Sequence, residues 1–74
     1  MWKFEAITSA GNRTQEFYSF DEAWYAMKSY IENRLKIGMS LQELETCLWL
    51  INPTGRPIYF YDAKDMAYAQ GLMN

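Results

Sequence analysis

The chain has 74 residues, of which 50% are hydrophobic, 18% aromatic and 22% charged, and its formal net charge is −2. This length predicts one compact domain over residues 1–74, and the aromatic content excludes an intrinsically disordered tail. Apolar runs such as Cys47 to Ile51 are far shorter than the roughly 20 residues that span a bilayer, and no basic and then apolar leader opens the chain. A single cysteine, Cys47, is typical of a reducing compartment, so we expect a cytoplasmic protein that does not bind membranes.

Residues 2–8 alternate between two kinds of side chain, which is the period of two that predicts a β-strand. The side expected to face the core carries Trp2, Phe4 and Ala6. Gly11 and Asn12 can both adopt a positive φ, so we expect a tight reversal there and a second strand over residues 13–18. Together these segments predict a β-hairpin.

Residues 19–38 have the pattern of a capped amphipathic helix. Ser19 and Glu22 fit a capping box, in which each side chain bonds the backbone N–H of the other residue. Gly38 is placed to end the helix. Apolar residues recur every three or four positions between these limits. The expected buried stripe consists of Phe20, Ala23, Trp24, Met27, Tyr30, Ile31 and Leu35.

A second capping box at Ser40 predicts a short helical turn over residues 41–45. Residues 46–52 are ambiguous, because their apolar positions could continue this helix or form a strand. The aromatic-rich apolar runs at 47–51 and 58–61 flank a turn that contains Pro and Gly. This arrangement favours a second hairpin over a longer helix.

The last helix is expected to begin at Asp62 as its N-cap and to stop at Gly71, with Leu72 folding back onto Ala67. The predicted fold is therefore α+β. It is a small antiparallel four-stranded sheet in the order β-β-α-(short α)-β-β-α, with the helices packed on one face.

The residue types argue against an enzyme. Histidine, the commonest general base and metal ligand, is absent, and Cys47 lies inside an apolar run where burial leaves a thiol inert. The glycines stand singly at turn positions, so there is no phosphate-binding loop. Each pair of acids falls in the first turn of an expected helix, where the dipole favours it: Asp21 with Glu22, Glu43 with Glu45, and Asp62 with Asp65. We therefore expect no catalytic residue, no metal and no cofactor.

Alternation also predicts which aromatic side chains the core does not need. If the last strand follows the first, Ile58 and Phe60 face the helices, and Tyr59 and Tyr61 point to the open side of the sheet. In the third strand, either Trp49 or its two leucine neighbours face outward.

Two tyrosines on the expected helices also lie away from the core. Tyr25 lies about 130° from the centre of the apolar stripe at 100° per residue, and Tyr68 sits opposite the apolar side of the last helix. Both should be exposed, and exposed Tyr and Trp are typical of protein interfaces. The candidate protein-binding residues are Tyr59, Tyr61, Tyr25, Tyr68 and Trp49.

The short, acidic, aromatic-rich chain with its single cysteine resembles, in size and composition, small phage-encoded proteins that bind and inhibit host enzymes. The resemblance implies a non-catalytic protein-binding domain, a viral protein that inhibits a host enzyme complex such as a nuclease or polymerase. We therefore expect another protein as the partner.

Two alternative functions remain open. One is a self-assembling structural subunit, a homo-oligomer. The other is single-stranded nucleic-acid binding by base stacking on the open sheet face. Its stacking platform would consist of Tyr18, Trp49, Tyr59 and Tyr61, with Arg13 and Arg56 at the hairpin tips. The negative net charge and dispersed basic residues argue against nucleic acid.

Overall fold

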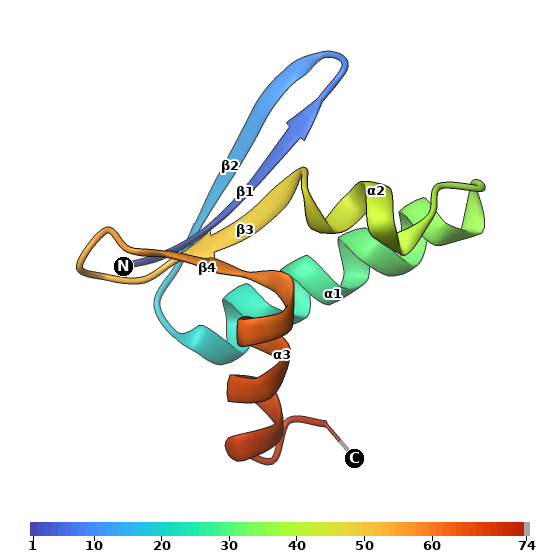
Figure 1. Ribbon diagram of the computed structural model, residues 1–74. Coiled ribbons are helices and arrows are strands. Elements are labelled where there is room, and N and C mark those ends of the chain that lie inside the picture. The colour runs from blue at the N-terminus through green and yellow to red at the C-terminus, as the bar shows by residue number, and fades with distance from the viewer. Residues whose placement is uncertain (74) are drawn as a thin grey trace.

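The computed structural model describes residues 1–73, which form four strands and three helices (Figure 1). In chain order these are β1 (Trp2–Thr8), β2 (Gly11–Phe17), α1 (Phe20–Lys36), α2 (Leu41–Glu45), β3 (Leu48–Ile51), β4 (Pro57–Tyr59) and α3 (Phe60–Ala69). The predicted α+β class and element order are confirmed, including the strand at β3 in place of a longer helix.

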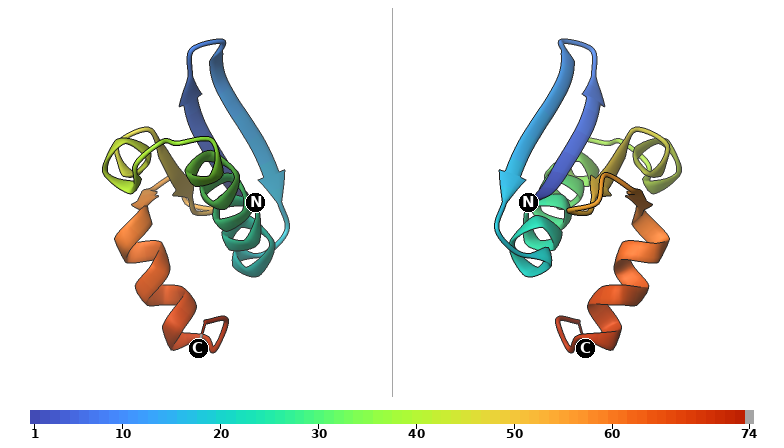
Figure 2. Two further views of the ribbon diagram at one scale, coloured as in Figure 1. Left: turned by 90° about the vertical axis from the view of Figure 1, so that its right-hand side faces the viewer. Right: turned by 90° about the vertical axis from the view of Figure 1, so that its left-hand side faces the viewer.

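The strands form one antiparallel sheet in the order β2-β1-β3-β4. β1 pairs with β2 in the first hairpin, and β3 pairs with β4 in the second. The pairing of β1 with β3 joins the two hairpins at the centre of the sheet. α1 and α3 pack against one face of this sheet, as the views in Figure 2 show, while the tip of the β1–β2 hairpin extends beyond the helices. The central strands are those whose inward residues are apolar.

Strand alternation decides which residues enter the core. Phe4 and Ala6 of β1 are buried as predicted, and Leu48 and Leu50 of β3 are buried beside them. The choice left open in the third strand is thereby settled, because the two leucines face the helices and Trp49 faces the opposite side of the sheet. That side is the one not covered by α1 and α3.

α1 buries most of its predicted stripe but not all of it. The residues it buries are Phe20, Ala23, Trp24, Met27 and Ile31. Tyr30 is half-buried against the ring of Phe4, and Leu35 is 44% exposed. The expectation for Leu35 is wrong because the last turn of α1 extends beyond the strands (Figure 1), so no sheet lies over it.

α3 begins earlier than its local sequence predicts. The helix starts at Phe60 with Tyr59 as N-cap and no side-chain cap, so the prediction that Asp62 is the N-cap is wrong. The physical reason is tertiary, because Phe60 stacks on Trp24 with ring centroids 6.2 Å apart. A further correction follows, since Phe60 and Tyr61 belong to α3 and not to the last strand.

The first hairpin turns two positions earlier than expected. Ser9 and Ala10 form the turn, Thr8 pairs directly with Gly11, and the Thr8 hydroxyl donates to the Gly11 carbonyl at 2.6 Å. Of Gly11 and Asn12, only Gly11 has a positive φ, at 113°, and Asn12 lies in the strand and not in the turn. β2 therefore begins at Gly11 and ends at Phe17.

The second hairpin closes around an Asx turn. The Asn52 side-chain oxygen accepts from the backbone N–H of Thr54 at 3.1 Å and of Arg56 at 2.9 Å. This side chain replaces strand hydrogen bonds where the chain reverses, which is the usual role of Asn in a turn.

Side-chain caps fix where α1 and α2 begin. The capping box at Ser40 is complete, with Glu43 N–H donating to the Ser40 hydroxyl and Ser40 N–H donating to the Glu43 carboxylate. At Ser19 the box is partial, because the Glu22 carboxylate accepts from the Ser19 hydroxyl and not from its N–H.

The C-terminal end of α3 follows the predicted pattern. Gly71 has a φ of 74°, its N–H donates to the Tyr68 carbonyl, and Leu72 N–H donates to the Ala67 carbonyl at 2.9 Å. These two bonds define a Schellman ending, which returns Leu72 to the core. Over residues 1–73, no helix combines the length and the apolar character needed to cross a bilayer.

Candidate functional site

The sheet side that faces away from α1 and α3 is the candidate site, and we call it the open face. The strand register assigns to it Lys3, Glu5 and Ile7 of β1, Asn12, Thr14 and Glu16 of β2, Trp49 and Ile51 of β3, and Pro57 and Tyr59 of β4. Its β3–β4 half is apolar, and its β1–β2 half is polar except for Ile7. The open face therefore has an apolar patch on β3 and β4 with polar residues beside it. An apolar patch with a polar rim is the usual layout of a protein interface.

A row of side-chain contacts crosses the open face from β2 to β4. The Trp49 indole Nε1 donates to Glu5 Oε1 at 2.9 Å, and the Thr14 hydroxyl donates to Glu5 Oε2 at 3.3 Å. On its other side, the Trp49 ring meets the Tyr59 ring edge-to-face with centroids 6.1 Å apart. One carboxylate thus ties three strands together and fixes the orientation of the indole.

The exposure of this row suits recognition more than core packing. Trp49 and Glu5 are half-buried, and Tyr59 is 53% exposed. The Glu5 carboxylate uses both oxygens on donors within the chain, so it limits the rotation of the indole while the ring keeps a surface in solvent. The result is a rigid, partly exposed aromatic pair.

Tyr61 lies apart from this pair. It is exposed, but its position on α3 places its ring against Phe60, with centroids 5.4 Å apart, and its hydroxyl beside Glu45. A hydrogen bond to the Glu45 carboxylate, and then the negative charge of that carboxylate, raise the pKa of Tyr61 above the ordinary value of 10.0. Glu45 Oε2 is buried and accepts no hydrogen bond within residues 1–73.

The other predicted site residues are not brought to the open face. Tyr25 on α1 is 50% exposed, and Tyr68 on α3 is exposed to a similar degree, as expected for both. Both belong to helices of the opposite layer. Tyr18 follows β2 and is 85% exposed, far from the β3–β4 half of the sheet. The proposed nucleic-acid platform is therefore not assembled, and Trp49 and Tyr59 are the members that meet.

Reasoning from the sequence missed Glu5 and Thr14. Alternation assigns Glu5 to the side opposite Phe4, but its bond to Trp49 depends on β1 being next to β3, which no local pattern reveals. The signal available in the sequence was an acid in the middle of an expected strand, where a neighbouring strand can supply a hydrogen-bond donor to the carboxylate.

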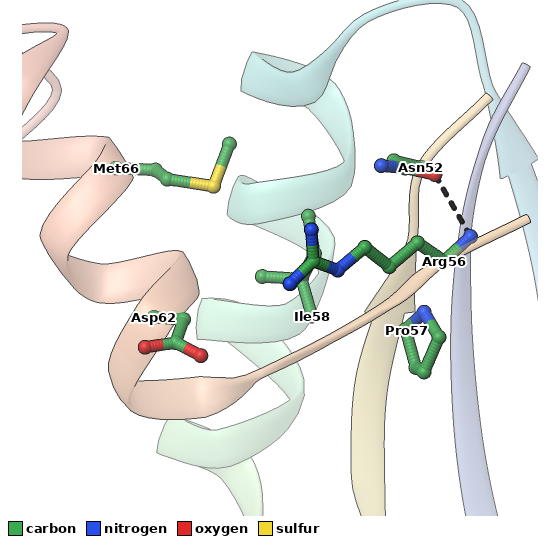
Figure 3. A pocket seen from close by; sticks show the side chains of 6 residues that line it. All are labelled: Asn52, Arg56, Pro57, Ile58, Asp62 and Met66. Atoms are coloured by element: carbon green, nitrogen blue, oxygen red, sulfur yellow. Dashed lines mark hydrogen bonds between the residues drawn. The ribbon is translucent and has the colours of Figure 1, made fainter. Parts of the chain in front are cut away.

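A pocket of about 250 Å³ lies on the other side of the β3–β4 hairpin, between that hairpin and α3 (Figure 3). It is lined by Asn52, Arg56, Pro57, Ile58, Asp62 and Met66. Figure 3 shows the Arg56 side chain extending from the turn towards Ile58. One guanidinium and one carboxylate among apolar walls offer a polar contact, but no nucleophile paired with a base.

A second pocket of about 230 Å³ lies between the end of β1 and α1, and is lined by Ile7, Thr8, Ser9, Tyr30, Arg34 and Met39. The Arg34 guanidinium lies over the Tyr30 ring, 4.9 Å from its centroid. The positive charge of Arg34 is therefore already engaged in a cation–π contact within the chain. Among residues 1–73, no group of three His, Cys, Asp or Glu side chains could hold a metal ion.

Comparison of the chain with protein-family models, with curated proteins and with solved structures gives no match. The functional argument therefore depends on the sequence and on the geometry of the open face.

Proposed function

We propose that the protein is a non-catalytic protein-binding domain whose contact surface is centred on Trp49 and Tyr59. The observation that supports this proposal is the indole of Trp49, held by Glu5 at 2.9 Å on a sheet face that α1 and α3 do not cover. A tryptophan that the core does not enclose, yet whose orientation is fixed, is ready for recognition before the partner arrives.

The physical advantage of such a site is pre-organisation. Trp and Tyr are the residues that most often dominate the energy of protein interfaces. A side chain that is already immobilised loses less rotamer entropy on binding, where each mobile side chain costs about 0.5–1.5 kcal/mol. Glu5 restricts Trp49, and the edge-to-face contact restricts Tyr59. The polar residues of β1 and β2 would form the rim.

The biological form that we propose is an inhibitor of a host enzyme complex, such as a nuclease or polymerase, acting in the cytoplasm. The proposal rests on the chain's resemblance in size and composition to phage-encoded inhibitors, and on Cys47 as a single thiol. It requires no catalysis by the protein itself, since an inhibitor acts by occupying a surface of its target.

Nucleic acid is the alternative occupant of the open face, because a Trp–Tyr pair could stack on bases. The charges of the open face disfavour nucleic-acid binding. Glu5 and Glu16 are acidic, Lys3 is the single basic side chain that the register places there, and phosphate contacts normally dominate such binding.

The test compares two tyrosines of similar exposure, Tyr59 and Tyr25. The partner is captured from host lysate, identified by mass spectrometry and purified, and its affinity is then measured for Tyr59→Ala and Tyr25→Ala. Tyr59→Ala should weaken binding at least about tenfold, because a hot-spot residue contributes about 2 kcal/mol or more. Tyr25→Ala, on the opposite layer of the fold, should bind as the wild type does.

The outcomes separate the alternatives. A folded Tyr59→Ala protein with undiminished affinity would remove the open face as the contact surface. Salt-dependent quenching of tryptophan fluorescence by short single-stranded oligonucleotides would favour nucleic acid instead.

A further inference from the structure

The two edges of the sheet are built differently. β4 is an edge strand of three residues that begins at Pro57 and passes directly into α3, so it offers little backbone for pairing. β2 is an edge strand of seven residues, Gly11–Phe17, without proline and in unbroken register with β1. Natural sheets normally protect a long edge with proline, charged side chains (especially lysine), a bulge or a covering element. β2 has no proline, lysine or bulge, no element within residues 1–73 covers its edge, and its charged side chains are Arg13 and Glu16.

The backbone groups at the free edge of β2 can be identified from the register. Ile7 N–H donates to the Cys47 carbonyl at 2.7 Å, so the odd-numbered residues of β1 bond to β3 and the even-numbered ones to β2. The partners of the even-numbered residues are the odd-numbered residues of β2. It follows that Asn12, Thr14 and Glu16 direct their N–H and C=O groups away from the sheet. Within residues 1–73, no other element bonds to these groups.

We propose that a second copy of this chain pairs with β2 in antiparallel orientation, with Thr14 opposite Thr14 of the second copy. Only even-numbered residues present free backbone groups, so the numbers of two paired residues must add to an even sum. The sum of 28 (11 + 17) is the register in which all seven residues of both strands are paired. In this register, the three residues whose backbone groups point away from the sheet, Asn12, Thr14 and Glu16, all form hydrogen-bonded pairs with the second copy.

The side chains are complementary in this register. Asn12 lies opposite Glu16 of the second copy (12 + 16 = 28), which sets an amide donor against a carboxylate, and Thr14 meets Thr14, a favourable cross-strand pair. Arg13 lies opposite Gln15. A sum of 26 would instead oppose Arg13 to Arg13, and a sum of 32 would oppose Glu16 to Glu16. Like charges directly opposite each other are destabilising, so these registers are disfavoured.

Tyr18 is a second observation that fits this occupant. It follows β2 immediately and is 85% exposed, so residues 1–73 of its own chain cover little of it. The same register places it opposite Ala10 of the second copy (18 + 10 = 28), in the Ser9–Ala10 turn. An aromatic ring that is largely exposed in one copy would thus be covered by the hairpin tip of the other.

The pairing would produce one continuous sheet of eight strands (4 + 4) in the order β4-β3-β1-β2-β2-β1-β3-β4. The twofold axis runs perpendicular to the sheet, so both open faces lie on the same side. If the proposed function is correct, the dimer presents two Trp49–Tyr59 pairs at its opposite ends and is bivalent.

Sedimentation of two lysine variants tests the register. The wild type should shift with concentration from its monomer mass of 8.8 kDa towards twice that value. Thr14→Lys places two like charges opposite each other and should lose the dimer. Asn12→Lys makes the same charge change on the same strand and face, but opposite Glu16, and should keep it. A wild type that stays monomeric at every concentration, or two variants with equal behaviour, would overturn the proposal.

Cross-linking gives a second, independent readout. In a Cys47→Ser background, Thr14→Cys should form a disulfide-linked dimer on mild oxidation, because the paired Cα atoms lie about 5.5 Å apart, within disulfide range. Asn12→Cys is the matched control, since its two copies are four residues out of register, about 13 Å apart. Equal cross-linking of the two variants would contradict the register.

Discussion

Trp24 is the largest side chain that the core encloses, at 1% exposure, and it stacks on Phe60 where α1 meets α3. Its indole N–H is buried without a hydrogen-bond partner among residues 1–73. An unpaired buried donor costs about 1–3 kcal/mol, whereas deleting a buried Trp side chain costs about 3–5 kcal/mol. Burial of the ring therefore outweighs the loss of solvation at the nitrogen.

This balance makes two substitutions at one position behave differently. Trp24→Ala should lower the free energy of unfolding by about 3–5 kcal/mol, which is most of what a small domain holds. Trp24→Phe keeps an aromatic ring and removes the unpaired donor, so its loss should be less than half as large. Urea unfolding measures both values. Melting of Trp24→Ala within a few degrees of the wild type would show that the helix face is assigned wrongly.

Tyr61 should titrate later than an ordinary tyrosine, because the Glu45 carboxylate favours the protonated phenol. The pKa is raised in the folded state, so the stabilisation is fully present below the unfolded value of about 10 and is lost as the pH rises through the folded pKa. Difference absorbance of tyrosinate between the wild type and Tyr61→Phe isolates this group. Glu45→Gln should lower its pKa. An unchanged titration in Glu45→Gln would contradict the assignment.

At the scale of elements, local signals predicted the features that depend on neighbouring residues. The capping box at Ser40 and the Schellman ending at Gly71 both formed, because each needs only a few residues and a suitable φ. Apolar runs on both sides of a turn favour the strand at 48–51 over a longer helix, and the Asn52 side chain closes that turn.

The start of α3 could not be predicted in the same way. Asp62 is the better N-cap by residue type, yet the helix begins at Phe60 with an uncapped end. Stacking of Phe60 on Trp24 is a contact between segments far apart in sequence, and it overrides the local preference. The N-cap lies three residues earlier than predicted, at Tyr59 and not Asp62, and this difference moves Tyr61 from the expected open face to a helix, which splits the predicted Tyr59–Tyr61 pair.

At the scale of the whole molecule, strand order was the missing information. Joining the two hairpins through β1 and β3 is a non-local choice, and the contact between Glu5 and Trp49 exists only because of it. The composition of the strands contains a physical hint. β2 is polar on both sides and β4 begins with proline, so both suit an edge, whereas the apolar inward residues of β1 and β3 suit the centre.

Hydrogen exchange tests this arrangement over the whole sheet. In dilute solution, amides at the β1–β3 junction, such as Glu5 and Ile7, should exchange most slowly, because their opening requires separation of the two hairpins. Within β2, Asn12, Thr14 and Glu16 should exchange fast, while the odd-numbered residues that bond to β1 are protected. Equal protection along β2 in dilute solution would contradict the register.

Hydrogen exchange at high protein concentration shows whether the β2 edge is free or paired with a second copy. If two copies join along β2, protection should rise at Asn12, Thr14 and Glu16 and change little at the β1–β3 junction, whose hydrogen bonds already exist in one copy. Thr14→Lys should remove this concentration dependence while leaving the junction protected. A rise in protection that spreads evenly over all strands would instead reflect general stabilisation of the fold, and would argue against pairing at this edge.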